Sequence, residues 1–166
     1  MLDLSRLESV ESESKFELVN LSLLIHEVAE QFASRAEQSN RFFKLDVSDE
    51  KIELIGDEMR LRQVLTNLLE NSIKFTQEND AISFSTQVID DKIQIKVSDT
   101  GIGIPNEDLP NLFKRFHRGR NVSEYAGNGL GLAIVKAIVD AHHGDVSVQS
   151  EGIDSGSEFL ITFPAW

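Results

Sequence analysis

The sequence predicts an α+β fold, in which one sheet is covered by helices on one face. Leucine and valine recur at helical spacing within residues 58–75, and a second apolar helix is predicted at 130–143. Residues 81–90 and 92–99 alternate between apolar and polar side chains, as half-buried strands do. Because the helices are mixed with strand pairs of this kind, the order of elements favours α+β architecture.

The remaining elements of the N-terminal half follow from shorter patterns. Residues 16–21 alternate weakly and predict a short strand, and residues 22–40 have the i, i+3, i+4 spacing of an amphipathic helix. Residues 41–47 and 51–56 alternate like the two strands of a hairpin. Asp57 follows at an N-cap position, where its carboxylate can accept hydrogen bonds from the first backbone N–H groups of the next helix.

The C-terminal half is predicted to end in two strands, at residues 145–150 and 157–164. Gly144 is expected to end the helix that precedes them, because glycine is the usual residue after a helix C-terminus. Residues 105–129 are polar and irregular, which is typical of a long loop.

Composition bounds the class of protein. The 166 residues suffice for one domain, which we place at residues 15–166, after a polar linker and the tail of a helix at 1–14. The net charge of -12 argues against nucleic acid or an anionic membrane surface as a partner, because both need a dense basic surface. The chain has no long apolar run, no secretory signal and no cysteine, which is compatible with the cytoplasm and excludes thiolate metal sites.

One face of the helix at 58–75 carries an unusual set of polar side chains. Asn67, Glu70, Asn71 and Lys74 fall at i, i+3, i+4 and i+7, so they share that face. Asparagine is a poor helix former, and exposed helix faces usually carry other polar residues. An ordinary solvated face remains one interpretation. The other is a platform for Mg²⁺ and phosphate, because an amide oxygen can bind Mg²⁺ and a lysine can face a phosphate.

A second candidate site is the segment VSDTGIGIP at residues 97–105. It places Asp99 at the end of a predicted strand, close to Gly101 and Gly103. A simple turn accounts for this composition. A ligand loop also accounts for it, since glycine lets the backbone approach a ligand and the acid can accept a hydrogen bond. An isolated D-x-G-x-G pattern does not decide between the two.

Three alternating glycines, Gly127, Gly129 and Gly131, lead into the second helix. The free N–H groups of a helix N-terminus suit a phosphate. The glycines match the dinucleotide-binding fingerprint only in part, because the third comes one residue early and no strand of a βαβ unit precedes it. We therefore do not expect a Rossmann domain.

The segment FKRFHRGR at residues 113–120 concentrates basic side chains in an acidic chain. A solvated loop that balances neighbouring acids is one interpretation. The other is a mobile lid whose cations meet a triphosphate when it closes, with Phe113 and Phe116 as apolar anchors.

Taken in order, these segments resemble the catalytic, ATP-binding domain of bacterial sensor histidine kinases, within the superfamily that includes type II topoisomerases and heat-shock chaperones. The N box is matched by LRQVLTNLLENSIKFT, the first glycine box by DTGIGIP, the F box by LFKRFHR, the second glycine box by GNGLGLAIVKAIVDAHHG and the last glycine-containing strand by GSEFLITFP. A single box is a weak signal, but the five occur in order and span nearly all of residues 16–164.

The resemblance implies a Bergerat-type α/β sandwich, with a mixed sheet of about five strands and three helices on one face. It also implies that ATP and Mg²⁺ bind. Asn71 matches the Mg²⁺ ligand, and Lys74 matches a lysine that contacts phosphate. Asp99 matches the acid that accepts a hydrogen bond from the adenine amino group, with Gly101 and Gly103 clearing space beside it. The nucleotide contacts implied in this way are Asn67, Asn71, Lys74, Phe75, Asp99, Gly101, Gly103, Ile104, Gly127, Gly129, Leu130, Gly131 and Leu132.

The same resemblance implies an ATP lid over residues 105–129 and a small set of catalytic side chains. Arg115 or Arg118 would meet the γ-phosphate. Glu70 or Asn67 would orient the acceptor imidazole or a water molecule, and Glu70 is the better base by its chemistry.

The expected function is that of the catalytic domain of a two-component sensor histidine kinase. Such a domain transfers the γ-phosphate of ATP to a histidine on the dimerisation hairpin of the parent kinase, for relay to a response regulator. The H-E-x-x-T/N-P motif of that hairpin is absent from this sequence, so residues 1–14 would be the end of a missing hairpin. The alternatives are a serine kinase of the anti-sigma type and a non-catalytic nucleotide-sensing or docking module. We expect this segment to be cytoplasmic and without direct membrane contact.

Overall fold

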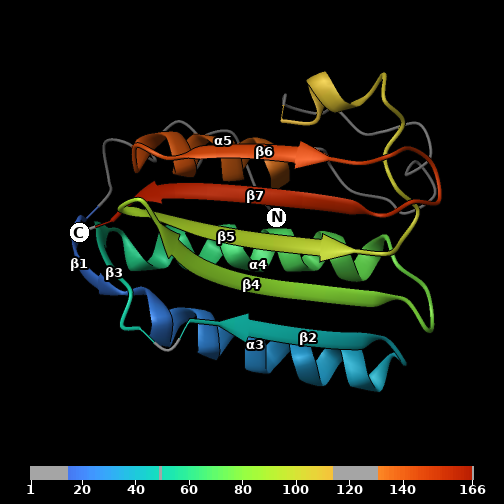
Figure 1. Cartoon of the computed structure of the whole chain (residues 1–166), viewed down its shortest axis with the longest axis horizontal. Coiled ribbons are helices and arrows are strands. Elements are labelled where there is room, and N and C mark those ends of the chain that lie inside the picture. The colour runs from blue at the N-terminus through green and yellow to red at the C-terminus, as the bar shows by residue number, and fades with distance from the viewer. Residues whose placement is uncertain (1–14, 49, 114–130, 166) are drawn as a thin grey trace.

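A computed structural model describes residues 15–48, 50–113 and 131–165 of the chain. Within these residues, the three α-helices lie against one face of a sheet, whose strands run side by side in Figure 1. The predicted α+β fold, with helices on one face, is therefore confirmed. The elements are β1 (Glu17–Asn20), α3 (Leu21–Gln38), β2 (Phe42–Val47), β3 (Glu53–Gly56), α4 (Glu58–Lys74), β4 (Ala81–Ile89), β5 (Lys92–Asp99), the 3₁₀ turn η1 (Leu109–Asn111), α5 (Gly131–Ala141), β6 (Asp145–Gln149) and β7 (Ser157–Pro164).

The main sheet has five strands in the order β2-β4-β5-β7-β6. β2 runs parallel to β4, and all the other neighbours are antiparallel. The sheet is therefore mixed, as expected. β1 and β3 form a separate, antiparallel two-stranded sheet.

The hairpin predicted for residues 41–56 is wrong, although both of its strands exist. β2 pairs with β4, from Phe42 opposite Ala81 to Val47 opposite Thr86. β3 pairs with β1, where Leu18 lies opposite Ile55. Alternation identifies a half-buried strand but not its partner. Here the partner of β2 comes after α4, as a crossover between parallel strands requires.

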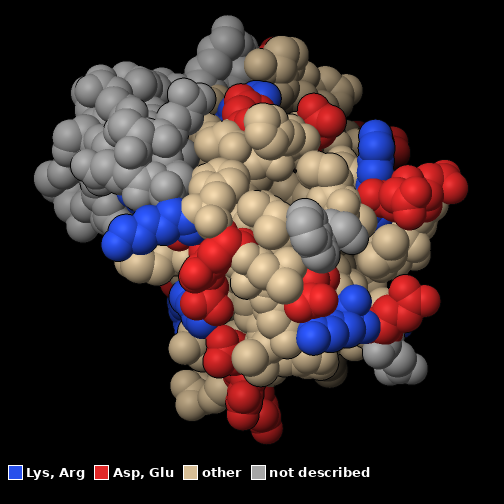
Figure 2. Space-filling view, turned by 90° about the vertical axis from the view of Figure 1, so that its left-hand side faces the viewer, with Lys and Arg blue, Asp and Glu red and all other residues tan. Residues whose placement is uncertain are grey.

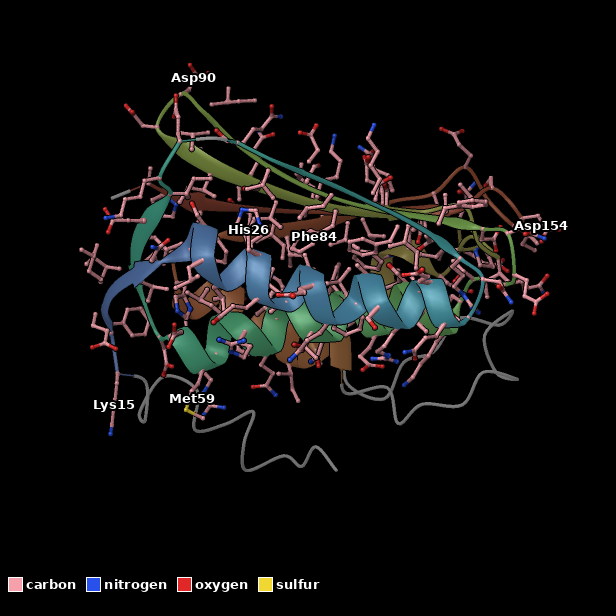
Figure 3. All side chains as sticks on the ribbon, turned by 90° about the horizontal axis from the view of Figure 1, so that it is seen from below. Lys15, His26, Met59, Phe84, Asp90 and Asp154 are labelled. Carbon is pink, nitrogen blue, oxygen red and sulfur yellow. The ribbon has the colours of Figure 1, made fainter. Side chains whose placement is uncertain are left out.

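The core lies between the sheet and the helices, around Phe84, which Figure 3 places between α3 and the strands. β5 alternates as predicted, with its apolar side chains buried. β4 alternates over its first six residues, where the buried positions are Ile82, Phe84 and Thr86, and its last residues are exposed. The predicted apolar face of α4 is buried, and none of its side chains is more than 2% exposed. Its members are Leu61, Val64, Leu65, Leu68 and Leu69.

Capping fixes the ends of the helices. Asp57 caps α4 as predicted, because its carboxylate accepts a hydrogen bond of 3.3 Å from the Arg60 N–H. At the end of α5 the left-handed residue is His143, with φ of 61°, and not Gly144. Gly144 is needed for a different reason: a Cβ there would lie 2.4 Å from the carbonyl oxygen of Thr162. The predicted end at residue 143 lies two residues beyond Ala141, where α5 ends, and the reason for the glycine is a different one.

The loops of the molecule divide between two ends of the sheet. The Asp90 turn lies at one end and Asp154, in the β6–β7 loop, at the other (Figure 3). β5 and α4 both end at the same end of the sheet as the loop between β6 and β7 (Figure 1). The opposite end, which faces the viewer in Figure 2, has basic side chains scattered among acidic ones without a continuous basic stripe.

None of the helices in the described ranges is both long enough and apolar enough to cross a membrane.

Candidate functional site

The Asp99 carboxylate is held rigidly at the end of β5. Its Oδ1 accepts a hydrogen bond of 2.9 Å from the Gly101 N–H, and its Oδ2 accepts one of 3.0 Å from the Ser157 hydroxyl. Burial raises the pKa of Asp99, and these hydrogen bonds oppose that shift in part. A half-buried acid with fixed oxygens is well suited to accept a further hydrogen bond from a ligand.

The loop that follows Asp99 is fastened on two sides. On one side, the Ile102 N–H donates to the carbonyl of Phe75, the residue after α4, at 3.0 Å. On the other side, the β6–β7 loop donates two backbone hydrogen bonds, from Gly156 to Gly101 at 3.1 Å and from Asp154 to Ile102 at 2.6 Å. The end of α4 and the Asp99 loop are therefore parts of one site.

The two glycines beside Asp99 allow close contacts between backbone segments. A Cβ on Gly101 would lie 2.0 Å from the Phe75 carbonyl oxygen. Gly103 has φ of 71°, and a Cβ there would lie 1.9 Å from the Gly152 carbonyl oxygen. The space next to both glycines is thus filled by the protein's own backbone. They allow the loop to approach the end of α4 and the β6–β7 loop.

The predicted polar face of α4 is present, but its members have different surroundings. Asn67 is half-buried and donates a hydrogen bond of 3.3 Å from Nδ2 to the Gly131 carbonyl at the start of α5. Asn71 is half-buried and Lys74 is exposed, in the turns of α4 that lead to Phe75. The helix therefore brings Asn71, Lys74 and Phe75 to the Asp99 end of the sheet.

Glu70 differs from its neighbours on α4, because it is paired with α3. Its two carboxylate oxygens accept hydrogen bonds from Arg35, at 2.6 and 3.3 Å. Arg35 also lies over the ring of Phe32, 4.8 Å from its centroid. A base at this position would first have to leave Arg35, just as the amide of Asn67 would have to leave the Gly131 carbonyl before it could orient an acceptor.

The described part of the predicted lid is anchored to the core. Leu112 is buried, and the ring of Phe113 meets Phe159 edge-on with centroids 6.3 Å apart. Ile104 and Leu132, at the two sides of the lid, are partly buried against the same core. Phe113 is thus an apolar anchor, as predicted. The rest of the predicted lid lies outside the described residues, and so does Leu130, which follows it; among these residues are the candidates Arg115, Phe116, Arg118, Gly127 and Gly129.

The donors present suit a magnesium ion shared with a phosphate. Within the described ranges, no three His, Cys, Asp or Glu side chains gather as a metal site. Mg²⁺ is usually bound by one or two protein oxygens together with phosphates and water, so a complete protein cage is not needed. The amide oxygen of Asn71 would be the ligand on α4.

Three supporting residues were not singled out by the sequence. The Ser157 hydroxyl donates a hydrogen bond to Asp99, and the Ser150 hydroxyl accepts one of 2.9 Å from the backbone N–H of Ile104. Arg41 bonds to Thr76 just beyond the end of α4, from Nε to the Thr76 hydroxyl at 2.7 Å. The sequence signal for these residues is slight: two serines near glycines and an arginine before a strand.

A shallow depression of about 260 Å³ lies on the first three turns of α4. It adjoins the candidate site through Asn67, and two arginines give it a basic character. Its lining residues are Met59, Arg60, Arg62, Gln63, Thr66 and Asn67.

Comparison with known proteins identifies the class. Residues 56–166 match the family model for histidine kinase-, DNA gyrase B-, and HSP90-like ATPases, so the chain belongs to this family. The sensor histidine kinase CusS of Escherichia coli K12 is 35% identical over 167 residues. The match covers 99% of this chain and 34% of CusS, so the chain spans about a third of that relative. The hybrid signal transduction histidine kinase L of Dictyostelium discoideum is 40% identical, and the match covers 91% of this chain and 9% of that protein.

Solved structures agree with this assignment. The nucleotide-free catalytic domain of the histidine kinase ThkA superposes with a TM-score of 0.79 at 30% identity, over 90% of this chain and 97% of that domain. Full-length ShkA in complex with AMPPNP superposes with a TM-score of 0.82 at 31% identity, over 97% of this chain and 33% of ShkA. A ThkA complex with the response regulator TrrA gives 0.77 at 28% identity, over 98% of this chain and 48% of ThkA. The fold is therefore that of histidine kinase catalytic domains.

Proposed function

We propose that this chain binds ATP with Mg²⁺ at the Asp99 end of the sheet, and that it acts as the catalytic domain of a longer histidine kinase. One observation carries the proposal. The loop that holds the Asp99 carboxylate donates a backbone hydrogen bond to the residue after α4, the helix that bears Asn71 and Lys74. A carboxylate that can accept a hydrogen bond from adenine would thus lie in one site with the side chains that would contact the phosphates. The AMPPNP bound to ShkA supports a nucleotide in this fold.

Each side chain has a distinct part in the proposed complex. Asp99 accepts a hydrogen bond from the amino group of adenine, and Phe75 borders the base. Asn71 and Asn67 supply polar groups near the phosphates, and Lys74 contacts a phosphate as a point charge. Bound Mg²⁺ would neutralise phosphate charge.

In the proposed reaction, a histidine nitrogen of the parent's helical hairpin attacks the γ-phosphorus. The bond to the β–γ bridging oxygen breaks and ADP leaves with that oxygen. The domain contributes mainly position and charge stabilisation, as is usual in phosphoryl transfer. Asn67, or Glu70 after release from Arg35, would orient the acceptor. The relay of the phosphate to a response regulator is supported by the ThkA complex with TrrA.

Calorimetric titration with ADP, with and without Mg²⁺, tests the metal half of this proposal. In Asn71→Ala we expect the gain in affinity from Mg²⁺ to disappear, while the affinity without Mg²⁺ stays close to that of the wild type. Gln31→Ala, an exposed polar change on α3, is the control and should behave like the wild type. An unchanged Mg²⁺ effect in Asn71→Ala would show that another group holds the ion.

Phosphate transfer is tested by adding the parent's separately produced hairpin and γ-labelled ATP to this chain. Label that appears on the hairpin histidine supports the kinase proposal. Nucleotide binding without transfer to any histidine of the hairpin would contradict it.

A further inference from the structure

The hydroxyl of Ser150 joins two loops next to the candidate site. It accepts a hydrogen bond of 2.9 Å from the backbone N–H of Ile104 and donates one of 2.7 Å to the carbonyl of Gly156. The Gly152 N–H also approaches it, at 3.3 Å. Ser150 comes directly after β6 and is half-buried, so water competes only in part with these bonds.

The two loops joined by Ser150 are paired along their length. The Asp99–Ile104 loop accepts hydrogen bonds from Ser157, Gly156 and Asp154, and at its end it donates one to Ser150. The Ser150 bond is the only one of these four that fixes Ile104, where the chain leaves for the segment 105–113. The β6–β7 loop therefore serves as a template that determines the course of the Asp99 loop.

We infer that Ser150 is a positioning residue for the base-binding half of the nucleotide site. This inference rests on the proposed function, since it deepens the account of the same site. The hydroxyl acts through its two backbone partners: it holds the Ile104 N–H and, through the Gly156 carbonyl, the turn that leads to Ser157 and Asp99. None of the hydrogen bonds of this hydroxyl in the described residues reaches α4, so we expect the phosphate and Mg²⁺ half of the site to keep its geometry when the hydroxyl is lost.

The chemistry of the serine makes this role testable. Alanine would leave the Ile104 N–H and the Gly156 carbonyl without their shared partner, whereas threonine would keep the hydroxyl. Ser155 offers a matched control in the same loop. It is exposed, and its hydroxyl donates only within the loop, to the Gly152 carbonyl at 2.6 Å.

The experiment measures ADP affinity with and without Mg²⁺ for the wild type, Ser150→Ala, Ser150→Thr and Ser155→Ala. Hydrogen exchange of the Ile104 amide is followed by NMR in the same samples. We expect Ser150→Ala to lower the ADP affinity about tenfold under both conditions, because a base-binding loop loses a fixed hydrogen bond. The ratio of the two affinities, which reports Mg²⁺ binding, should stay unchanged. The Ile104 amide should lose protection, Ser150→Thr should restore both properties, and Ser155→Ala should resemble the wild type.

Wild-type ADP affinity in Ser150→Ala would overturn the inference, and so would a failure of Ser150→Thr to restore it. A loss confined to the Mg²⁺ condition would also overturn it, because it would place the effect at the phosphates. If Ser150→Ala does not fold, Ser150→Cys replaces it, since a thiol keeps the approximate size and weakens both bonds. If the wild type itself binds no ADP, the proposed function fails, and the inference fails with it.

Discussion

The ring of His142 ties the end of α5 to the start of α4. Its Nε2 accepts a hydrogen bond of 3.0 Å from the backbone N–H of Asp57, and its Nδ1 lies 2.8 Å from the Ile138 carbonyl. A nitrogen that accepts from an N–H cannot carry its own proton, so the geometry requires neutral imidazole with the proton on Nδ1. Phe16 stacks on this ring, with centroids 4.6 Å apart.

This arrangement predicts acid sensitivity of the fold. Burial lowers the pKa of His142, although the Ile138 carbonyl and the charge of Asp57 oppose this shift. Between a pH of about 6.5 and the lower pKa of the folded state, the unfolded chain binds a proton at this residue while the folded chain does not. The free energy of unfolding should therefore fall as the pH drops through this range, by at most about 1.4 kcal/mol per pH unit. Urea unfolding at several pH values between about 5 and about 7 measures this dependence of the unfolding free energy on pH.

His142→Gln, which can still accept from the Asp57 N–H, should show a flatter dependence on pH. His26→Gln, a change at an exposed histidine of α3, is the control and should keep the wild-type slope. Equal slopes in all three proteins would show that His142 does not titrate as its contacts require.

Asp99 should lower stability while supporting ligand binding. Burial raises the pKa of its carboxyl, so ionising Asp99 costs more free energy in the folded protein than in the unfolded chain. Asp99→Asn removes that charge, and we expect equal or higher stability, by up to about 1 kcal/mol, with a loss of ADP affinity of about tenfold or more. Thermal unfolding and calorimetry on the same samples measure the two effects. A variant that binds ADP as the wild type does would exclude Asp99 as a ligand of the base.

Arg41 should stabilise the end of α4 more than a surface ion pair would. It donates from Nε to the Thr76 hydroxyl at 2.7 Å and from a terminal nitrogen to the Thr76 carbonyl at 2.5 Å. Thr76 is buried, so Arg41→Met should cost about 1–3 kcal/mol in unfolding free energy. Arg62→Met, which breaks an exposed pair with Glu27, should cost less than about 1 kcal/mol. Denaturant unfolding compares them, and equal costs would contradict this account.

The β4–β5 turn is strained in a way that one substitution can relieve. Asp90 and Asp91 have φ of 53° and 61°, a conformation that favours glycine or asparagine. Asp91→Gly should therefore raise the unfolding free energy by about 0.5–1 kcal/mol. Asp46→Gly in β2, where the backbone is extended, should change stability in the opposite direction. A destabilising effect of Asp91→Gly would show that the aspartate side chain contributes more than the backbone strain costs.

Local patterns predicted most of the fold because they report on burial. The leucines of α4 and the alternation of β4 and β5 each record which side of an element faces the core. The partner of β2 was missed because pairing depends on distant segments, and a strand alternates in the same way beside any neighbour. The αL residue at His143 was missed because the adjacent Gly144 is the statistically favoured choice.

For a similar reason, only some residues of the candidate site could be predicted from the sequence. Asp99, Asn71 and Lys74 lie toward one end of the sheet, and their roles toward a nucleotide stay predictions. The contact of Gly101 with the Phe75 carbonyl was not predicted, because it appears only in the folded chain. Ser150 carries no motif of its own, since its importance arises from where the two loops meet.

The most direct test of the central claim is to map ADP binding on the amide spectrum of the ¹⁵N-labelled chain. We predict that the largest chemical-shift changes occur at residues 99–104 and at Asn71, Lys74 and Phe75, and that they weaken in Asp99→Asn. Changes confined to the depression around Met59 and Gln63, or no changes at all, would contradict a nucleotide site between the Asp99 loop and the end of α4.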